Sequence, residues 1–208
     1  MAASDFFEII VEGKGGHAAL PHFSNDTTLA SSAIVLALQQ IVSRRISALQ
    51  SVVLSVTGLC TDTMAHNVTP DSVRITGTTR FLNEVERQKM PGSIEKTAQS
   101  TAEAYGCTAN VRYEFGVSIT DNYDKNTEFA IEAAEAVVGP SNIKTDIEPI
   151  MAGEDFSEML AGCPGAFIFL GNGPSASWHN PSYDFNNEAL PFGCSWFANL
   201  AEKRLPLE

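Results

Sequence analysis

Apolar residues follow two different spacings along the first 115 positions, and the spacing predicts which stretches are strands and which are helices. Phe and Ile crowd Asp5 to Val11 before a glycine-rich loop, and apolar residues alternate with polar ones from Ser51 to Leu59. Both stretches are typical of strands. Between them, apolar residues recur at helical spacing after Asn25 or Asp26, either of which can cap the start of a helix. We therefore expect a strand, a helix and a second strand in that order.

The order continues with a third strand, a second helix and a fourth strand. The turn formers of Asn67 to Asp71 precede Ser72 to Leu82, which is rich in Val, Ile and Thr. A helix is expected from about Pro91 to Gly106, because proline is tolerated in a first turn. Thr108 to Phe115 alternates again. This order predicts a ferredoxin-like βαββαβ sandwich with two helices on one face of an antiparallel sheet, and we assign it to residues 1–116.

Residues 117–208 have a different pattern. One helix is expected from about Thr127 to Val138, and a last helix from Asn187 or Glu188 to Lys203. Ala166 to Leu170 is wholly apolar, as in strands that are buried on both faces of a parallel sheet. One such strand is too few for an independent doubly wound domain, because sheets commonly have about five to six strands. The sequence therefore predicts part of an α/β domain after the sandwich.

The charge balance narrows the class of partners. The 208 residues carry a formal net charge of -12, with 13 basic and 25 acidic side chains. An acidic surface repels nucleic acid and anionic lipid, so we expect no nucleic acid and no membrane as partners and favour a small molecule or a protein. No apolar run is long enough to cross a bilayer and no secretory leader precedes the first strand, which favours a cytoplasmic protein.

The four cysteines lie far apart and form no CxxC pair. They are Cys60, Cys107, Cys163 and Cys194. This spacing indicates neither a zinc knuckle nor a disulfide scaffold. We interpret all four as reduced thiols and most of them as buried.

His17 is the candidate functional residue of the first part. It follows two glycines at the end of the first expected strand. Glycine lets backbone approach a ligand closely, and an imidazole at that place can be aimed at the ligand. An ordinary surface turn is the alternative interpretation. His22 and His66 have no comparable setting, and we favour structural or solvated roles for both.

Glu154 and His179 are the candidates of the second part. Glu154 and Asp155 follow a glycine in an expected loop, where adjacent carboxylates can hold a metal, orient a histidine or bind a cation. The alternative is a helix N-terminus stabilised by acidic side chains. His179 follows the carboxyl end of the expected buried strand, where open α/β sheets bind ligands, so it is a candidate metal ligand or acid-base group. Asp184 to Asn186 can supply an acceptor beside it or cap the final helix.

Six motifs occur in an order that is far more specific than any one of them. They are Met1 to Phe7, Gly13 to His22, Asn67 to Asp71, Gly77 to Arg80, Gly153 to Phe156 and His179 to Asn186. In sequence and order they resemble the hippurate-hydrolase and amino-acid-conjugate amidohydrolase branch of the aminoacylase/carboxypeptidase family of zinc metallopeptidases. The resemblance covers almost the whole chain.

The resemblance implies a lid, which also forms the homodimer, inserted into a zinc-peptidase-like α/β catalytic domain. In that family two divalent metals, such as zinc or manganese, activate a water that attacks an amide carbonyl. By this resemblance His179 is a metal ligand, and His17 reaches the partner subunit's site and stabilises the tetrahedral oxyanion. Asn67 and Arg80, which taken alone are a turn former and a strand charge, bind the substrate, Arg80 through its carboxylate. Glu154 belongs to the active-site loop.

The resemblance also implies that the family's other metal ligands and its general-base glutamate precede the lid. No histidine or paired-glutamate motif precedes His17 in this sequence. We therefore expect a truncated member, with the lid in residues 1–116, the last part of the catalytic domain in residues 117–208, and metal absent or incompletely bound. The expected activity, hydrolysis of N-acyl amino acids, would then be lost in this chain alone. The alternative is a dimerisation or binding module, or a regulatory partner, without catalysis.

Overall fold

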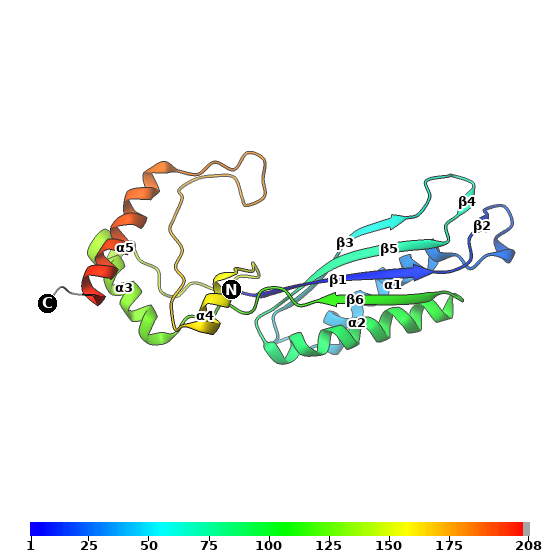
Figure 1. Cartoon of the computed structure of the whole chain (residues 1–208), viewed down its shortest axis with the longest axis horizontal. Helices are drawn as coiled ribbons and strands as arrows, with labels where there is room; N and C mark the ends of the chain where they lie inside the picture. The colour runs from blue at the N-terminus through cyan, green and yellow to red at the C-terminus, as the bar shows by residue number, and fades with distance from the viewer. Residues whose placement is uncertain (206–208) are drawn as a thin grey trace. The chain divides into compact units, whose positions relative to one another are not determined.

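A four-stranded antiparallel sheet with two helices on one face forms the first of two units in the computed structural model, which describes residues 1–205 (Figure 1). Unit 1 consists of Met1–Thr120 and Pro149–Ser157, and unit 2 of Asp121–Glu148 and the residues from Glu158 onward. The strands of the sheet are β1 (Ala3–Glu12), β3 (Val52–Thr61), β5 (Ser72–Phe81) and β6 (Thr108–Glu114). The helices are α1 (Thr27–Gln40), continued by the π-helical turn η2 (Ile41–Arg45), and α2 (Glu84–Ala104).

The strand order is β3-β5-β1-β6, which is the order of a ferredoxin-like sandwich. The central strand β1 pairs antiparallel with both neighbours, so that Ile9 lies opposite Ile75 of β5 and Val111 of β6. Side chains alternate between the two faces of a strand, and in β1 the buried residues from Phe7 to Val11 are the odd-numbered ones. The predicted fold class and the predicted order of elements in this unit are confirmed.

The two helices begin at side-chain caps. The carboxylate of Asp26, one of the two residues that the sequence allows as the cap of α1, accepts hydrogen bonds from the backbone of Thr28 at 2.9 Å and of Leu29 at 3.0 Å. In α2 the cap is Asn83, which accepts from the backbone of Val85 at 2.8 Å. The predicted start near Pro91 is wrong, since Pro91 lies inside α2. A proline removes only one backbone donor, and the cap and the acidic first turn stabilise the helix before it.

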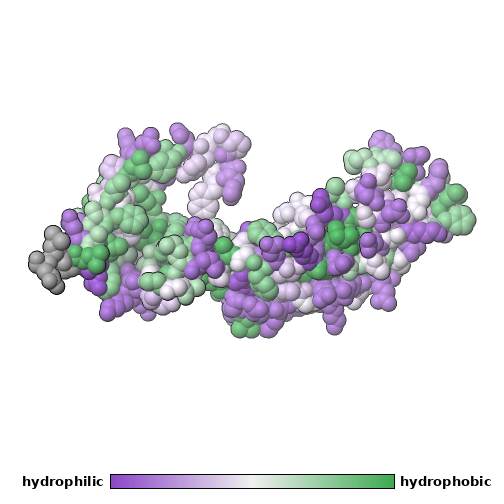
Figure 2. Space-filling model, in the orientation of Figure 1, coloured by the Kyte–Doolittle hydropathy of each residue, from purple (hydrophilic) through white to green (hydrophobic). Residues whose placement is uncertain are grey.

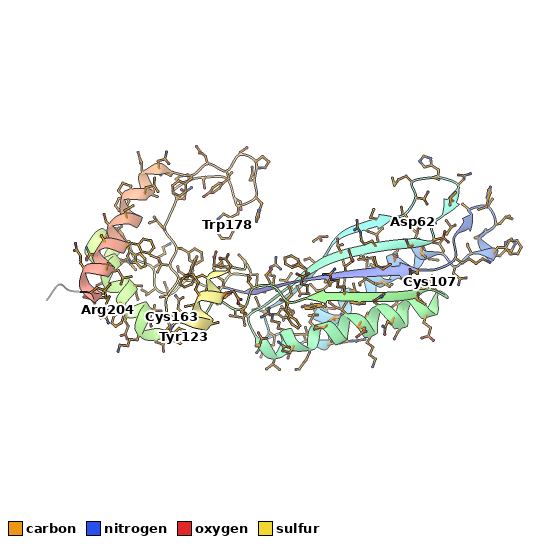
Figure 3. All side chains as sticks on the ribbon, in the orientation of Figure 1. Asp62, Cys107, Tyr123, Cys163, Trp178 and Arg204 are labelled. Atoms are coloured by element: carbon orange, nitrogen blue, oxygen red, sulfur yellow. The ribbon has the colours of Figure 1, made fainter. Side chains whose placement is uncertain are left out.

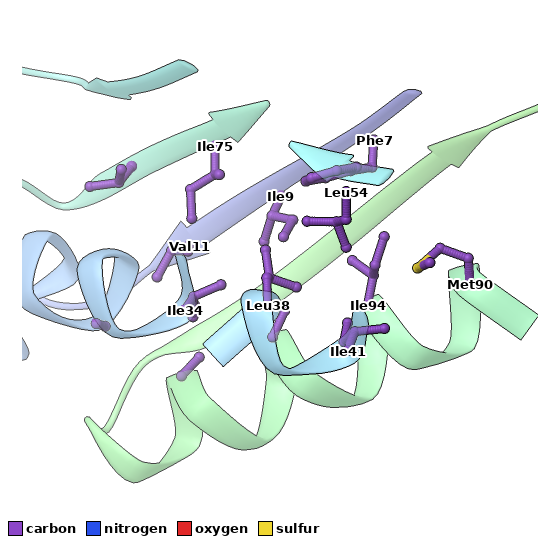
Figure 4. Packing of buried hydrophobic residues seen from close by; sticks show 14 of the residues in the cluster. Phe7, Ile9, Val11, Ile34, Leu38, Ile41, Leu54, Ile75, Met90 and Ile94 are labelled. Atoms are coloured by element: carbon purple, nitrogen blue, oxygen red, sulfur yellow. The ribbon is translucent and has the colours of Figure 1, made fainter. Parts of the chain in front are cut away.

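The core of unit 1 lies between the sheet and the two helices. Figure 4 shows its apolar side chains converging from β1, β5, α1 and α2, and many of them have no exposed surface. The labelled members are Phe7, Ile9, Val11, Ile34, Leu38, Ile41, Leu54, Ile75, Met90 and Ile94. Burial of this set is the main favourable contribution to the stability of the sandwich.

A buried ion pair crosses one end of this core. Arg87 of α2 binds Asp5 of β1 through two guanidinium nitrogens, with Nη2 2.7 Å from Oδ1 and Nε 3.0 Å from Oδ2. Asp5 also accepts from the hydroxyl of Tyr113 at 2.9 Å and from the backbone N–H of Gly116 at 3.0 Å. These hydrogen bonds with Asp5 raise the pKa of Arg87, so the guanidinium stays charged. The pair therefore joins β1, α2, β6 and the segment that follows β6.

Unit 2 is built around two packed helices, α3 (Asp124–Val138) and α5 (Leu190–Arg204). The indole of Trp196 donates to the backbone oxygen of Ala130 at 3.0 Å, and the guanidinium of Arg204 lies 3.6 Å from the ring centre of Phe129. Figure 2 shows apolar surface on these helices, where Leu190 and Phe197 are exposed. The short elements of the chain are β2 (Gly16–His17), η1 (Pro21–Phe23), β4 (Val68–Thr69), η3 (Pro140–Asn142), α4 (Phe156–Gly162) and η4 (Asn187–Ala189).

The predicted strand at Ala166 to Leu170 is wrong. The described part of unit 2 contains no strand, and Ile168, Phe169 and Leu170 are 38% to 48% exposed. The side-chain amide of Asn122 accepts from the backbone N–H of Phe167 at 2.8 Å and donates to its carbonyl at 2.9 Å. These two hydrogen bonds resemble the pair that one residue of a neighbouring antiparallel strand would form with Phe167. Apolar composition indicates that a segment suits burial, but a strand also needs a neighbouring strand to form hydrogen bonds with.

The cysteine thiols are mostly exposed in the described residues. All four cysteines are free, but only Cys107 is buried, so the interpretation of most thiols as buried is wrong. Burial raises the pKa of the Cys107 thiol. Within residues 1–205, no helix combines the length and the apolar character needed to cross a membrane.

We expect Arg87→Ala to lower the free energy of unfolding by about 3–5 kcal/mol, because it leaves the charge of Asp5 buried without its partner. Urea unfolding followed by circular dichroism measures this. Lys89→Ala is the matched control on the same helix, since Lys89 pairs with Glu86 at the surface and exposed pairs contribute only about 0–1 kcal/mol. Equal losses in the two variants would contradict the central role of the buried pair.

Stability should also fall at high pH through Tyr113. Burial raises the pKa of Tyr113 above its ordinary value of about 10, so the folded chain favours the neutral phenol. Its contribution is therefore complete below about pH 10 and is lost as the pH rises from there toward the folded pKa. Unfolding measured between about pH 9 and 11 should show a shallower decline for Tyr113→Phe than for the unaltered chain. Tyr105→Phe, at an exposed position, should decline like the unaltered chain.

Candidate functional site

The structure brings His17 and Asn67 together, although they are far apart in the sequence. Strands β2 and β4 form a two-stranded ribbon in which His17 lies opposite Val68 and Gly16 opposite Thr69. The backbone oxygen of Asn67 accepts from the N–H of Ala18 at 3.0 Å. Both candidate side chains are exposed. The ribbon therefore carries two exposed polar side chains on two segments that its hydrogen bonds join.

Local hydrogen bonds decide which ring nitrogen of His17 faces outward as a donor. The backbone N–H of Ala19 donates to Nδ1 of His17 at 3.1 Å, and the N–H of Leu20 donates to the His17 carbonyl at 2.8 Å. A neutral imidazole has one donor and one acceptor nitrogen, so acceptance at Nδ1 places the proton on Nε2. His17 thus presents a positioned N–H, which is the kind of group that stabilises an oxyanion.

Arg80 lies near the other end of β5. It pairs across the sheet with Ser4 of β1 and Val53 of β3. Its Nη1 donates to the hydroxyl of Thr78 and to the carbonyl of Thr79, the latter at 3.0 Å. Desolvation by burial lowers the pKa of Arg80, and the charge of Asp5 opposes that shift.

The remaining edge of the Arg80 guanidinium, Nε and Nη2, has no hydrogen-bond or ion-pair partner among the residues that the structure describes. Asp5, the nearby carboxylate, is already engaged by Arg87. Two parallel N–H donors on one edge match the two oxygens of a carboxylate. The arrangement can therefore bind a carboxylate ligand in a forked geometry.

Glu154 lies in the part of unit 1 that comes from later in the chain, Pro149–Ser157. This segment runs beside the start of β1, where the N–H of Ala2 donates to the carbonyl of Ala152 at 3.0 Å. The carboxylate of Glu154 accepts from the backbone N–H of Phe156, the first residue of α4, at 3.4 Å. This contact is of the kind expected for an acidic residue at a helix start, one of the two roles that the sequence left open.

The ribbon and Arg80 lie at opposite ends of the sheet. Figure 1 shows β2 and β4 at the end of the sheet remote from the first residue of the chain, whereas Arg80 pairs with Ser4 near that residue. The span from Ser72 to Arg80 covers eight residue steps, or about 27 Å at about 3.4 Å per residue. One copy of unit 1 therefore does not bring His17 and Arg80 to the same small ligand.

His179 lies on an exposed loop of unit 2, together with Trp178, which Figure 3 labels. Its prediction at the carboxyl end of a buried strand is wrong, because that strand does not form. The backbone of His179 has a φ of 60°, in the left-handed region that non-glycine residues seldom adopt. Asn186 accepts from the N–H of Glu188 at 3.0 Å and so caps η4.

A residue that the sequence analysis missed holds the base of this loop. The side chain of Asn172 accepts from the N–H of Asn186 at 2.8 Å and donates to the carbonyl of Asp184 at 3.2 Å. Its setting between two glycines was the available signal, because asparagine side chains often bond backbone in such turns. Asn172 therefore joins the two ends of the segment that carries His179.

The described residues do not fit a dinuclear metal centre by themselves. No three or more His, Cys, Asp or Glu side chains within residues 1–205 are grouped so that they could hold a metal ion. His179 would need several deprotonated ligands converging with it. The candidate residues instead fall into three places: the ribbon with His17 and Asn67, the opposite end of the sheet with Arg80 and Glu154, and the loop of His179.

Comparisons with known proteins give the family. Residues 5–203 match the peptidase family M20/M25/M40. The chain is 35% identical over 201 residues to the N-acetylcysteine deacetylase of Bacillus subtilis, covering 97% of this chain and 52% of that protein. It is 34% identical over 205 residues to the hippurate hydrolase of Campylobacter jejuni, covering 99% of this chain and 53% of that protein. The chain thus spans about half the length of the curated relatives it matches.

A solved structure agrees with this assignment. The YXEP protein of Bacillus subtilis, described as a dinuclear metal binding peptidase from the M20 family, superposes with a TM-score of 0.72 at 27% identity, covering 99% of this chain and 51% of that one. Fold, sequence identity and the matched range point the same way. The chain belongs to peptidase family M20/M25/M40.

Proposed function

We propose that this chain is part of a metal-dependent amidohydrolase that cleaves the amide bond of N-acyl amino acids or related hippurate-like conjugates. Residues 1–116 are its lid and dimerisation domain, and residues 117–208 are the carboxyl-terminal part of its catalytic domain. Relatives whose names state such reactions, a deacetylase and a hippurate hydrolase, support the substrate class. The observation that carries the proposal is the edge of the Arg80 guanidinium that has no partner within residues 1–205, which suits the free carboxylate that every N-acyl amino acid retains.

Two of the site residues bind the substrate, and a third stabilises the oxyanion that forms during the reaction. Arg80 grips the substrate carboxylate, and Asn67 supplies a further polar contact. His17 donates its Nε2–H to the oxygen of the amide carbonyl as that oxygen becomes negative. Such a donor acts by stabilising charge that develops in the transition state, so its loss lowers kcat more than it raises KM.

The distance between the ribbon and Arg80 supports a homodimeric enzyme. Because about 27 Å of strand separates them, His17 and Arg80 of one copy serve different sites. A two-fold dimer through the lid would place His17 of each copy at the site that contains the other copy's Arg80, since such a dimer exchanges equivalent surfaces. Each site is then shared between two chains.

Two divalent ions, zinc or manganese, are the cofactors that we propose for the complete enzyme, with His179 as one ligand. When bound, they supply an activated water for attack on the amide. His179 is the metal ligand that we assign to this chain. Within residues 1–205, no group of three or more His, Cys, Asp or Glu side chains that could hold a metal ion surrounds it. We therefore propose that this chain alone is inactive and that other residues of the same enzyme complete the centre.

The purified chain with added manganese or zinc should show no hydrolysis of hippurate and no stoichiometric metal by plasma mass spectrometry. A chimera that joins it behind the amino-terminal half of the Campylobacter jejuni hippurate hydrolase, a protein of which this chain covers 53%, should bind metal and hydrolyse hippurate. Turnover by the chain alone would contradict the proposed incompleteness. A folded chimera that binds metal but cleaves no N-acyl amino acid would contradict the proposed function.

A mixed-dimer experiment in the same chimera tests the shared site. His17→Ala removes one donor and should lower kcat by about 10²–10³. Arg80→Gln removes the carboxylate contact and should raise KM by about tenfold or more. Unfolding and refolding the two variants together should restore about a quarter of the unaltered activity, because half of the dimers are mixed and each mixed dimer has one intact site. No recovery, with mixed dimers shown by mass spectrometry, would mean that each chain completes its own site.

A further inference from the structure

Asp71 binds the glycine loop that leads to the ribbon of His17, and Lys14 in the same loop pairs with Asn25 through backbone hydrogen bonds. The carboxylate of Asp71 accepts from the backbone N–H of Gly15 at 2.8 Å, and its carbonyl accepts from the N–H of Gly13 at 3.0 Å. Asp71 thus binds both sides of the glycine loop that leads from β1 to the ribbon. In the sequence alone, Asp71 is only the last residue of the expected turn Asn67 to Asp71.

The backbone next to Asp71 is bound to the first residue of α1. The preceding residue, Pro70, is buried, and its carbonyl accepts from the hydroxyl of Thr27 at 2.8 Å. Thr27 has no exposed surface and is the first residue of α1. The position of Asp71 is therefore set by the helical core, whereas the ribbon beyond it is exposed.

The fit between Asp71 and the loop depends on Gly15. A Cβ atom at Gly15 would lie 2.5 Å from the carbonyl oxygen of Thr69 and 3.0 Å from the carboxylate of Asp71. Real Cβ atoms do not approach backbone oxygen so closely, so only glycine permits this contact. We call Gly13, Gly15 and Asp71, with the two hydrogen bonds that join them, the clamp at the base of the ribbon.

We propose that Asp71 is a positioning residue for His17. By holding Gly15, it sets the register in which Gly16 faces Thr69 and His17 faces Val68. That register places Ala18 against the carbonyl of Asn67 and lets the N–H of Ala19 reach Nδ1 of His17. The proton on Nε2, and hence the donor that the ribbon presents, depends on this chain of contacts. The role of this donor rests on the proposed function, but the clamp itself does not.

Hydrogen exchange of the chain, measured by NMR, tests the clamp without any activity assay. In Asp71→Ala the amides of Ala18 and Ala19 should exchange roughly tenfold faster, and the coupling across the hydrogen bond between Ala19 N and His17 Nδ1 should disappear. Asp71→Asn keeps an acceptor oxygen and should preserve both signals. The amides of Ile9 and Ile75, in the core strands, should be unchanged in both variants.

Asp62→Ala is the matched control. Asp62, labelled in Figure 3, is also an aspartate that accepts a backbone N–H in this region, from Ser72 at 2.9 Å, but it makes no hydrogen bond to the glycine loop. It should leave the signals of Ala18 and Ala19 intact. Unchanged exchange at Ala18 and Ala19 in Asp71→Ala, an equal acceleration at Ile9 and Ile75, or the same effect in Asp62→Ala would each overturn the assignment.

Because this test measures only the ribbon, its outcome is separate from that of the proposed hydrolase activity. Loss of the clamp signals in an inactive chimera would leave the positioning role standing and the proposed function refuted. Intact clamp signals in Asp71→Ala within an active chimera would refute the positioning role alone.

Discussion

The buried ion pair between Asp5 and Arg87 is the constraint on which the rest of unit 1 depends. Removing two charges from water is costly, and the cost is offset only when every group is paired in good geometry. Asp5 meets this condition with Arg87, Tyr113 and the backbone of Gly116. It lies on the same face of β1 as Phe7. A shift of β1 by one residue would turn Asp5 to the open face and leave Arg87 with only the half-exposed Glu84 as an acid, so the pair favours one register of the central strand.

That register determines where the candidate site residues lie. With β1 and β5 paired over ten positions, Ser4 meets Arg80 at one end and Glu12 meets Ser72 at the other. The glycine loop follows Glu12 in the chain, and Asp71 directly precedes Ser72, so both lie beyond the second of these pairs. The glycine loop leads to the ribbon that carries His17. The separation of His17 from Arg80 is therefore a consequence of strand length, and it is the reason why a shared site between two copies suits this fold.

The sequence predicted those parts of the chain whose structure depends on nearby residues. The Phe and Ile residues around Ile9 and the cap residues Asn25 and Asp26 are local signals, and the structure has the corresponding strand and a helix capped by Asp26. The start of α2 was missed because Pro91 was taken as a first-turn residue, whereas the helix begins earlier at the cap Asn83. The run at Ala166 to Leu170 was predicted as a strand from composition alone, whereas a strand requires a distant segment as its neighbour.

In the candidate site, too, features that depend on nearby residues could be predicted and features that depend on distant residues could not. The motifs around His17 and Asn67 identified the residues, but their adjacency depends on pairing between segments about fifty positions apart, which no local pattern contains. Asp71 escaped notice because an aspartate after Asn67-Val68-Thr69-Pro70 is an ordinary turn former until its partner, the N–H of Gly15, is known.

In the proposed homodimer, His17 acts at the partner's site, so its direction has to be set by contacts within its own exposed ribbon. The ring of His17 is exposed, so apolar packing does not fix its direction. Hydrogen bonds of the backbone hold it instead: Ala19 to the ring, Ala18 to Asn67, and the glycine loop to Asp71. The hydroxyl of Thr27 binds the carbonyl of Pro70, the residue before Asp71. Preorganisation of this kind lets a donor act without losing conformational freedom at the moment of reaction. The clamp at Asp71 therefore restricts the orientation of the exposed His17 ring, as apolar packing restricts a side chain inside a pocket.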